Sequence, residues 1–250
     1  MQLQKIKNLI VSGCSFTAVP DHVKGWSELL ATYLNADNYV NLAYPGAGNR
    51  YIAESLVDHL SRYAYDPEST LVIPMWSGIS RKDMIVDEDE YYSFKGDMSK
   101  TFVNKKHYIF SGGYNGLWLD QSDANYKRMQ KLFKEYYMHT SEREMHLLTV
   151  EYMQYLKDFL DSKKYNYRFT TFTKYWHSTW FYAEESLDSI DAINLNAATN
   201  KEVGSIYRAK WLPYTIHEEA QRLNSFDEDG FHPGPLAHLH YAMHVLKQLR

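Results

Sequence analysis

The sequence predicts an α/β protein built on an open parallel sheet, and two observations lead to this prediction. In the first third of the chain, three short apolar runs of strand length alternate with two amphipathic helical stretches. This strand-helix-strand-helix-strand order implies parallel pairing with right-handed crossovers. In addition, 44% of the 250 residues are hydrophobic, so the chain can bury a substantial core.

The hydrophobic periodicity defines the first elements. It predicts strands at 8–11, 39–43 and 71–75, and helices at 26–34 and from 49 to about 65. Pro74 lies inside the third strand and lacks an N–H group for the sheet ladder. We therefore expect that strand to lie at an edge or to end near Pro74.

The pattern changes after Arg81. Residues 83–120 are acidic, rich in Tyr and Gly, and typical of an inserted hairpin with loops. Further on, the periodicity predicts helices at 124–139, 141–162 and 236–249 and a strand at 165–172, and a capping box opens the helix at Ser141. Residues 176–225 predict no clear element. The simplest organisation is a single domain over residues 1–250, with an insertion at about 83–140.

Charge and composition exclude several classes of protein. The formal net charge of −4 and the pI of about 6.3 argue against a nucleic-acid-binding surface, which needs a basic face. No apolar stretch approaches the length of a membrane span, and the one near the start is too short for a signal peptide. A cytoplasmic location is therefore the default expectation. The single cysteine excludes an internal disulfide.

Polar loops follow each of the first three predicted strands, at 12–17, 43–49 and 76–81. Ligands of open parallel sheets bind beyond the carboxyl ends of the strands, so these loops are the expected site. Ser15, in the first loop, is a candidate nucleophile that needs a base. Asp229 and His232 lie three residues apart in a predicted turn, where the carboxylate can reach Nδ1 while Nε2 faces outward. Cys14 is expected to be a small buried residue.

Three short blocks carry a resemblance to a known family. GCSFT from Gly13, NLAYPG from Asn41 and DGFHP from Asp229 resemble blocks of the SGNH (GDSL-type) hydrolases, in the same order. The matching regions span the first 80 residues and about the last 25. The resemblance implies a three-layer α/β/α sandwich with a flavodoxin-like parallel sheet. It also implies a serine esterase without a metal or organic cofactor.

The family's roles carry over where residues match. Ser15 resembles the nucleophile, and its N–H resembles one oxyanion donor. Gly46 resembles the glycine whose N–H is the second donor. Asp229 and His232 resemble the pair that activates the serine.

The third block of the family, Gly-x-Asn-Asp, has no counterpart after the third strand. Its asparagine completes the oxyanion hole, and loss of one such donor typically lowers turnover by ~10²–10³-fold. Either Ser77, the N–H of Gly78 or Asn49 substitutes for it, or catalysis is weak or absent. Cys14 also replaces the aspartate of the family's first block.

Arg81 and Trp76 are candidate substrate-binding residues in the third loop. Arg81 suits a carboxylate or phosphate, or a salt bridge with an acid such as Asp83 or Glu88. Aromatic clusters either wall a carbohydrate-sized cleft or pack in the core or a lid. They are Tyr91-Tyr92, Tyr114/Trp118 and Tyr175-Trp176/Trp180.

Three further histidines are not expected to be metal ligands. His240 and His244 have the i, i+4 spacing of a metal pair, but no glutamate follows the first of them as in zinc helices. A solvated polar helix face is the expected role of both. His238, close after the His-Pro turn, is expected to be structural.

The sequence thus predicts a hydrolase of small-molecule or glycan esters, which removes O-acyl groups from a carbohydrate. Two alternatives remain open. One is an acyltransferase that uses the same three residues, and the other is a non-catalytic binding or structural module with this fold. No feature indicates an oligomeric state.

Overall fold

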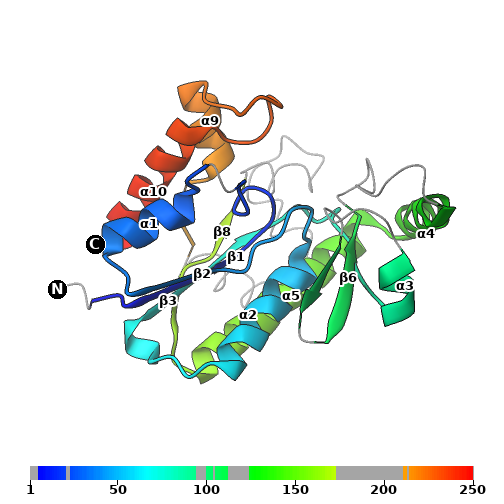
Figure 1. The fold of residues 1–250 in the computed structure, drawn as a ribbon, viewed down its shortest axis with the longest axis horizontal. Helices are drawn as coiled ribbons and strands as arrows, with labels where there is room; N and C mark the ends of the chain where they lie inside the picture. Colours follow the sequence, from blue (N-terminus) through cyan, green and yellow to red (C-terminus); the bar gives the residue numbers. More distant parts are fainter. Residues whose placement is uncertain are drawn as a thin grey trace.

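A computed structural model describes residues 5–20, 23–93, 100–103, 105–111, 124–172, 211–212 and 214–249. Its centre is a parallel sheet with the strand order β2-β1-β3-β7, and β8 pairs with the far end of β3 (Figure 1). The strands are β1 (Asn8–Ser12), β2 (Asn38–Asn41), β3 (Thr70–Trp76), β7 (Asn166–Tyr167) and β8 (Thr170–Thr171).

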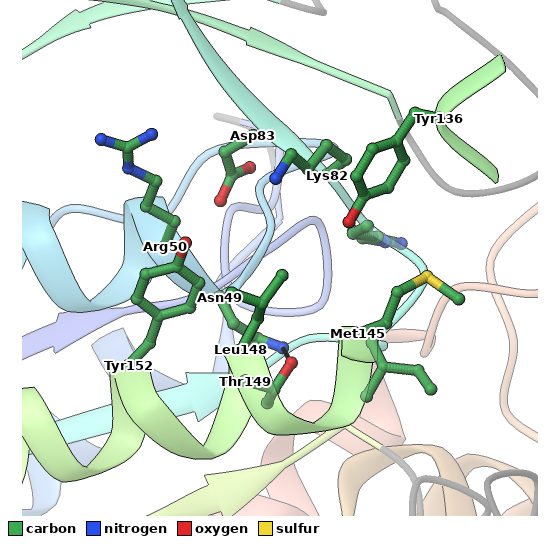
Figure 2. A pocket seen from close by; sticks show the side chains of 11 residues that line it. Asn49, Arg50, Lys82, Asp83, Tyr136, Met145, Leu148, Thr149 and Tyr152 are labelled. Atoms are coloured by element: carbon green, nitrogen blue, oxygen red, sulfur yellow. Dashed lines mark hydrogen bonds between the residues drawn. The ribbon is translucent and has the colours of Figure 1, made fainter. Parts of the chain in front are cut away.

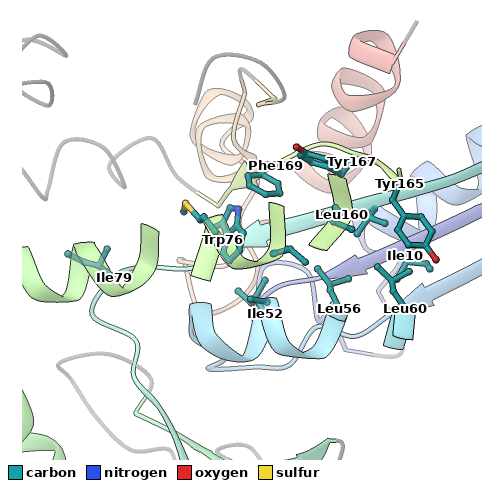
Figure 3. Packing of buried hydrophobic residues seen from close by; sticks show 14 of the residues in the cluster. Ile10, Ile52, Leu56, Leu60, Trp76, Ile79, Leu160, Tyr165, Tyr167 and Phe169 are labelled. Atoms are coloured by element: carbon teal, nitrogen blue, oxygen red, sulfur yellow. The ribbon is translucent and has the colours of Figure 1, made fainter. Parts of the chain in front are cut away.

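Two helical layers cover the sheet, and the strand residues alternate between them. Ile10, Val72 and Trp76 pack beneath α2 (Asn49–Arg62) and α5 (Glu142–Ser162), as Figure 3 shows for Ile10 and Trp76. Leu9 and Ile73 point to the opposite face, against α1 (Trp26–Leu34) and α10 (Pro235–Leu249). The predicted α/β fold with a parallel sheet between helices is therefore confirmed.

Most helix boundaries agree with the sequence pattern. The helices α1 and α4 (Ala124–His139) have the predicted ranges. The predicted cap of α5 is present, since the Ser141 hydroxyl accepts a hydrogen bond from the Glu144 N–H. The helix α2 ends at Arg62 rather than near Tyr65, because Tyr63 has an extended backbone (φ −111, ψ 129) and is followed by the short 3₁₀ turn Pro67–Ser69.

The third strand is not an edge strand, and it continues through Pro74 to Trp76. Its partner on one side, β1, pairs up to Pro74 itself. On the other side, β7 pairs with Leu71 and Val72, and β8 pairs with Met75 and Trp76. Pro74 thus lies at the break between two short partners, and the predicted strand at 165–172 is divided there.

The insertion is more regular than the sequence indicates. It forms an antiparallel sheet in the order β4-β6-β5, with strands β4 (Asp83–Val86), β5 (Lys100–Val103) and β6 (Lys106–Phe110) and the helix α3 (Glu88–Ser93). Glu54 of α2 holds this sheet by accepting hydrogen bonds from Lys106 and Tyr108 of β6. A helix that the sequence does not predict, α9 (Ile216–Leu223), packs beside α10. Across the described ranges, every helix is too short or too polar to cross a membrane.

Candidate active site

The loop after β1 presents Ser15 in a tight turn. The Cys14 carbonyl accepts hydrogen bonds from the N–H groups of Thr17 and Ala18, both 2.8 Å long, so the chain reverses at once. A Cβ at Gly13 would lie only 2.5 Å from the Thr17 hydroxyl, which explains the glycine there. Cys14 is fully buried in the core, as expected, whereas Ser15 is half-buried.

The turn before α10 holds Asp229 and His232. The Oδ1 of Asp229 accepts hydrogen bonds from the N–H groups of Phe231 (2.9 Å) and His232 (2.8 Å). Gly230 has a left-handed φ of 69°, a conformation that glycine adopts without strain. The N–H of Asp227 closes the turn on the His232 carbonyl at 2.8 Å. Hydrogen bonds between near neighbours in the sequence therefore orient the Asp229 carboxylate, independently of its bond to the imidazole.

Three of the predicted site residues form one hydrogen-bonded chain. The Nε2 of His232 lies 2.8 Å from the Oγ of Ser15, a residue 217 positions away in sequence. The Nδ1 of the same ring donates to the Oδ2 of Asp229. This order of serine, imidazole and carboxylate can move a proton from the hydroxyl to Nε2 while the carboxylate stabilises the charged ring.

The carboxylate of this chain stays ionised over the whole neutral range. Partial burial acts to raise the pKa of Asp229, but the hydrogen bonds from the His232 ring and from the N–H groups of His232 and Phe231 lower it to about 2. The side chain of Asp229 is 49% exposed and that of His232 is 22% exposed. The site is therefore open to solvent on the carboxylate side.

His238 links the turn that carries Asp229 and His232 to the first helix. Its Nδ1 accepts a hydrogen bond from the N–H of Trp26, the first residue of α1, at 3.2 Å. The ring also bonds the backbone of Pro233, next to His232, and it is almost fully buried. The structural role expected for His238 thus consists of joining α1 to the turn that carries His232.

His238 makes the stability of the fold depend on pH. Burial lowers its pKa to about 4, whereas an unfolded histidine titrates near 6.5. Between these values unfolding takes up a proton, so stability falls as the pH falls. We expect this residue to remove about 2 kcal/mol of unfolding free energy between pH 7 and pH 5.

Urea unfolding of the wild type and of His238→Gln at both pH values measures this contribution. The amide keeps a donor and an acceptor but does not titrate, so the variant should lose about 2 kcal/mol less than the wild type on acidification. Asp83, whose pKa burial raises to about 6, acts in the opposite direction in both proteins and cancels in the difference. Equal losses in the two proteins would contradict the assignment.

The loop after β2 brings Gly46 to the same edge of the sheet. The N–H of Ala47 donates to the Tyr44 carbonyl, and Gly46 has a φ of 80°, so residues 44–47 form a turn of the type II pattern with Pro45 in its preferred place. The N–H of Tyr44 donates to the Gly13 carbonyl at 3.1 Å, which ties this turn to the Ser15 loop. Within the described ranges, the N–H groups of Ser15 and Gly46 donate to no protein acceptor.

Among the candidates for the third oxyanion donor, the Asn49 amide and the Ser77 N–H have other partners. The Asn49 amide donates to the Ser77 carbonyl and the Thr149 hydroxyl, both at 3.1 Å, and its oxygen accepts the Ser77 N–H at 2.8 Å. Asn49 therefore clamps the end of β3 to α2 and α5, and both its own donors and the Ser77 N–H are engaged. The N–H of Gly78 makes no hydrogen bond to any described residue.

The structure corrects the interpretation of Trp76. Its side chain is fully buried, with the ring against Phe169 at a centroid distance of 5.3 Å (Figure 3). It faces the α2 and α5 layer and cannot contact a substrate. The salt bridge that was one alternative for Arg81 is also not formed, because neither Asp83 nor Glu88 is among its partners in the described ranges.

The other predicted clusters lie apart from the three-residue chain or outside the described residues. Tyr91 and Tyr92 pack on His107 of the inserted sheet. His240 and His244 do not simply face solvent, since both lie within 3.6 Å of the buried Glu219 carboxylate. The described part of the chain contains no group of three potential ligands that could hold a metal. Tyr114, Trp118, Tyr175, Trp176 and Trp180 lie outside the described residues.

Sequence reasoning missed an aromatic wall beside His232. The ring of Phe16 lies 5.2 Å from the His232 ring and 5.4 Å from that of Phe231. Phe172 and His217 complete the group, and Phe231 is 48% exposed. Phe16 directly follows Ser15, and Phe231 directly precedes His232. This adjacency in the sequence was the available signal.

Fold and site together define an α/β protein with a Ser-His-Asp chain at the carboxyl edge of its parallel sheet. A family model described as a family of unknown function (DUF6071) matches residues 20–196, and the chain belongs to that family. A search of curated proteins found no match. Among solved structures, the chain is similar to a member of the lipolytic protein G-D-S-L family from Veillonella parvula DSM 2008, with 14% identity, 96% of each chain covered and a TM-score of 0.46.

Proposed function

We propose that this protein is a serine hydrolase of the SGNH type that cleaves small carboxylic esters. The observation that carries the proposal is the hydrogen-bonded chain from Ser15 through His232 to Asp229. The order of blocks along the sequence agrees with it, since each residue stands where the family has the same role.

The reaction follows from the positions of these groups. The Ser15 oxygen attacks the ester carbonyl while His232 Nε2 takes the hydroxyl proton. The same imidazolium then gives its proton to the leaving alcohol, and an acyl-enzyme on Ser15 remains. Water, activated by the neutral ring, attacks the acyl group, and the departing Ser15 oxygen regains the proton. Asp229 remains a carboxylate throughout and holds the ring in the required tautomer.

Backbone N–H groups stabilise the oxyanion of the tetrahedral intermediate. Those of Ser15 and Gly46 serve as two donors, and their lack of acceptors within the described ranges supports this role. We assign the third N–H to Gly78, because it has no acceptor among the described residues, whereas the Asn49 amide is engaged elsewhere. The exposed ring of Phe231 offers a surface on which a sugar ring stacks, in keeping with an O-acylated carbohydrate as substrate.

Covalent labelling tests the nucleophile directly. A fluorophosphonate probe should label the wild type at Ser15, and the wild type should hydrolyse p-nitrophenyl acetate. Ser15→Ala should lose both properties, because the alanine has no oxygen to attack. The matched control is Cys14→Ala, which changes the buried neighbour and should keep both.

An unlabelled wild type that hydrolyses no p-nitrophenyl ester of any short acyl chain would support the non-catalytic module instead. Labelling with transfer of the acyl group to an added sugar, faster than to water, would identify an acyltransferase. A panel of O-acetylated sugars, compared with simple alkyl acetates, then tests the carbohydrate assignment.

A further inference from the structure

A polar pocket lies between α2, α5 and the segment that leads into β4, and none of Ser15, His232 and Asp229 lines it. It is a shallow pocket, and its empty space is about 300 Å³ when the open solvent at its mouth is counted. In Figure 2, Asn49 lies at its centre, Leu148 and Thr149 rise from α5, and Lys82 and Tyr136 approach from the opposite side. Three cationic residues, Arg50, Arg81 and Lys82, line this one small space.

Two of these cations form no ion pair with a carboxylate in the described ranges. The Arg50 guanidinium is engaged, since its Nε donates to Glu54 at 2.9 Å. Arg81 and Lys82 form no ion pair with any residue that the structure describes. Within the same ranges, the Nη1 of Arg81 is buried and has no hydrogen-bond partner. A buried donor without an acceptor is costly, and a bound oxyanion removes that cost.

Lys82 is also held partly out of water. Its Nζ lies 4.7 Å from the centroid of the Tyr136 ring, and burial lowers the pKa of the amine. Asp83 and Glu144 attract the Lys82 amine electrostatically, without an ion pair in the described ranges. Asp83 is bonded to the N–H groups of Gly48 (2.6 Å) and Tyr51 (2.8 Å) at the start of α2. The Asp83 carboxylate thus accepts its hydrogen bonds from the start of the helix, and it forms no ion pair with Arg81 or Lys82.

The backbone that carries the two cations is fixed in place. The Lys82 N–H donates to the Ser111 hydroxyl at 2.9 Å, and the Lys82 carbonyl accepts the Ser111 N–H at 3.0 Å. The Arg81 N–H closes a turn on the Gly78 carbonyl at 3.1 Å. Positions that are fixed before binding reduce the entropy lost when a ligand binds.

We propose that this pocket is a binding site for the oxyanion of a small ligand, a phosphate or carboxylate group held by Arg81 and Lys82. The planar guanidinium binds two oxygens of such a group side by side, and the ammonium supplies a point charge from the other side. The hydroxyl-bearing rings of Tyr136 and Tyr152 line the same space and suit the rest of a polar ligand. The site does not depend on hydrolysis at Ser15.

Isothermal titration calorimetry at pH 7.5, with ionic strength held constant by chloride, tests the proposal. The ligands are inorganic phosphate and succinate in separate titrations, which distinguish the two sources of the oxyanion. We expect at least one to bind with a stoichiometry of one. Arg81→Met and Lys82→Met should each weaken it about tenfold or more, because each removes a charge-assisted hydrogen bond.

Three further variants keep the result interpretable. Arg81→Lys retains the charge without the planar fork and should fall between the wild type and Arg81→Met. Arg62→Met removes an exposed cation at the far end of α2 and should bind as the wild type does. Ser15→Ala should also bind normally, so a failure of the hydrolase proposal leaves this test intact.

The proposal would be overturned by any of three results. The first is the absence of a heat of binding for either ligand up to tens of millimolar. The second is an equal affinity in the wild type and in the folded Arg81→Met and Lys82→Met proteins. The third is that Arg62→Met weakens binding as much as the Arg81→Met and Lys82→Met substitutions do. Circular dichroism establishes that each variant is folded. If Arg81→Met does not fold, Lys82→Met and Arg81→Lys decide the question alone.

Discussion

Replacing Asp229 by asparagine is expected to lower kcat for p-nitrophenyl acetate by about 10⁴-fold, the effect of this substitution in serine proteases with the same three groups. The asparagine oxygen can still accept the N–H groups of Phe231 and His232, so the turn should keep its shape. What changes is the partner of the His232 ring, which loses a negative charge and can adopt the wrong tautomer. The fold should therefore survive while the chemistry fails.

The neighbouring carboxylate provides the matched control. Glu228 is exposed on the same turn, and Glu228→Gln removes the same charge one residue away from Asp229. Steady-state kinetics should show kcat within about twofold of the wild type for this variant, since surface charge changes of this kind have small effects. If both variants lose activity equally, the effect comes from the charge of the turn and not from the bond to His232.

The dependence of stability on pH adds a second check on the same carboxylate. The hydrogen bonds that lower the pKa of Asp229 to about 2 outweigh the effect of its partial burial. An unfolded aspartate titrates near 3.9, so the stability that these bonds contribute is complete above that value and is lost as the pH falls toward 2. Asp229 therefore needs no deprotonation step at any pH from 5 to 9.

Replacing Gly48 by alanine is expected to lower the free energy of unfolding by about 3 kcal/mol. The backbone of Gly48 is extended, so the conformation itself is not the reason. An added Cβ would lie 2.6 Å from the Arg81 carbonyl oxygen and 2.8 Å from the Asp83 carboxylate. To relieve this contact, Asp83 must move away from the N–H groups that it caps at the start of α2.

A second glycine of the same edge serves as the comparison for stability. At Gly78 the nearest atom to an added Cβ is the Ser80 hydroxyl at 3.9 Å, so Gly78→Ala should change the free energy of unfolding by less than about 0.5 kcal/mol. Urea or guanidinium unfolding of both variants measures the difference. A Gly48→Ala protein as stable as Gly78→Ala would show that the inserted sheet does not pack tightly on α2.

Local patterns were sufficient to predict the first three strands of the sheet and the helices α1, α2, α4, α5 and α10. Buried runs such as Leu9–Val11 are continuous and apolar because both faces of a central parallel strand are covered. Tyr165–Phe172 was less predictable, since its division into two strands depends on where Pro74 of another strand interrupts the ladder. The hairpin expected in the insertion is formed by β5 and β6, but the third strand β4 and the helix α3 were not predicted, because their pattern is short and mixed.

The candidate site divides in the same way. Ser15, Asp229 and His232 could be chosen from sequence because each stands in a short motif next to a strand end or turn. Trp76 could not be judged, since a residue at a strand end points either into the core or toward the ligand, depending on the register. Asn49 was placed among the oxyanion donors because it is near in sequence, yet it bonds to Thr149, a residue 100 positions away.

The sequence by itself determined the strand and helix order, the residues at the strand ends and the shape of the Asp229–His232 turn, because these depend on neighbours within a few residues. Only the tertiary structure decided that His232 Nε2 lies 2.8 Å from Ser15, across 217 positions. It also decided that Asn49 is engaged as a clamp, and that Arg81 and Lys82 line one pocket without an ion pair to a carboxylate in the described part of the chain. Such contacts join residues far apart in the sequence, and they exist only once the sheet has brought the strand ends to one edge.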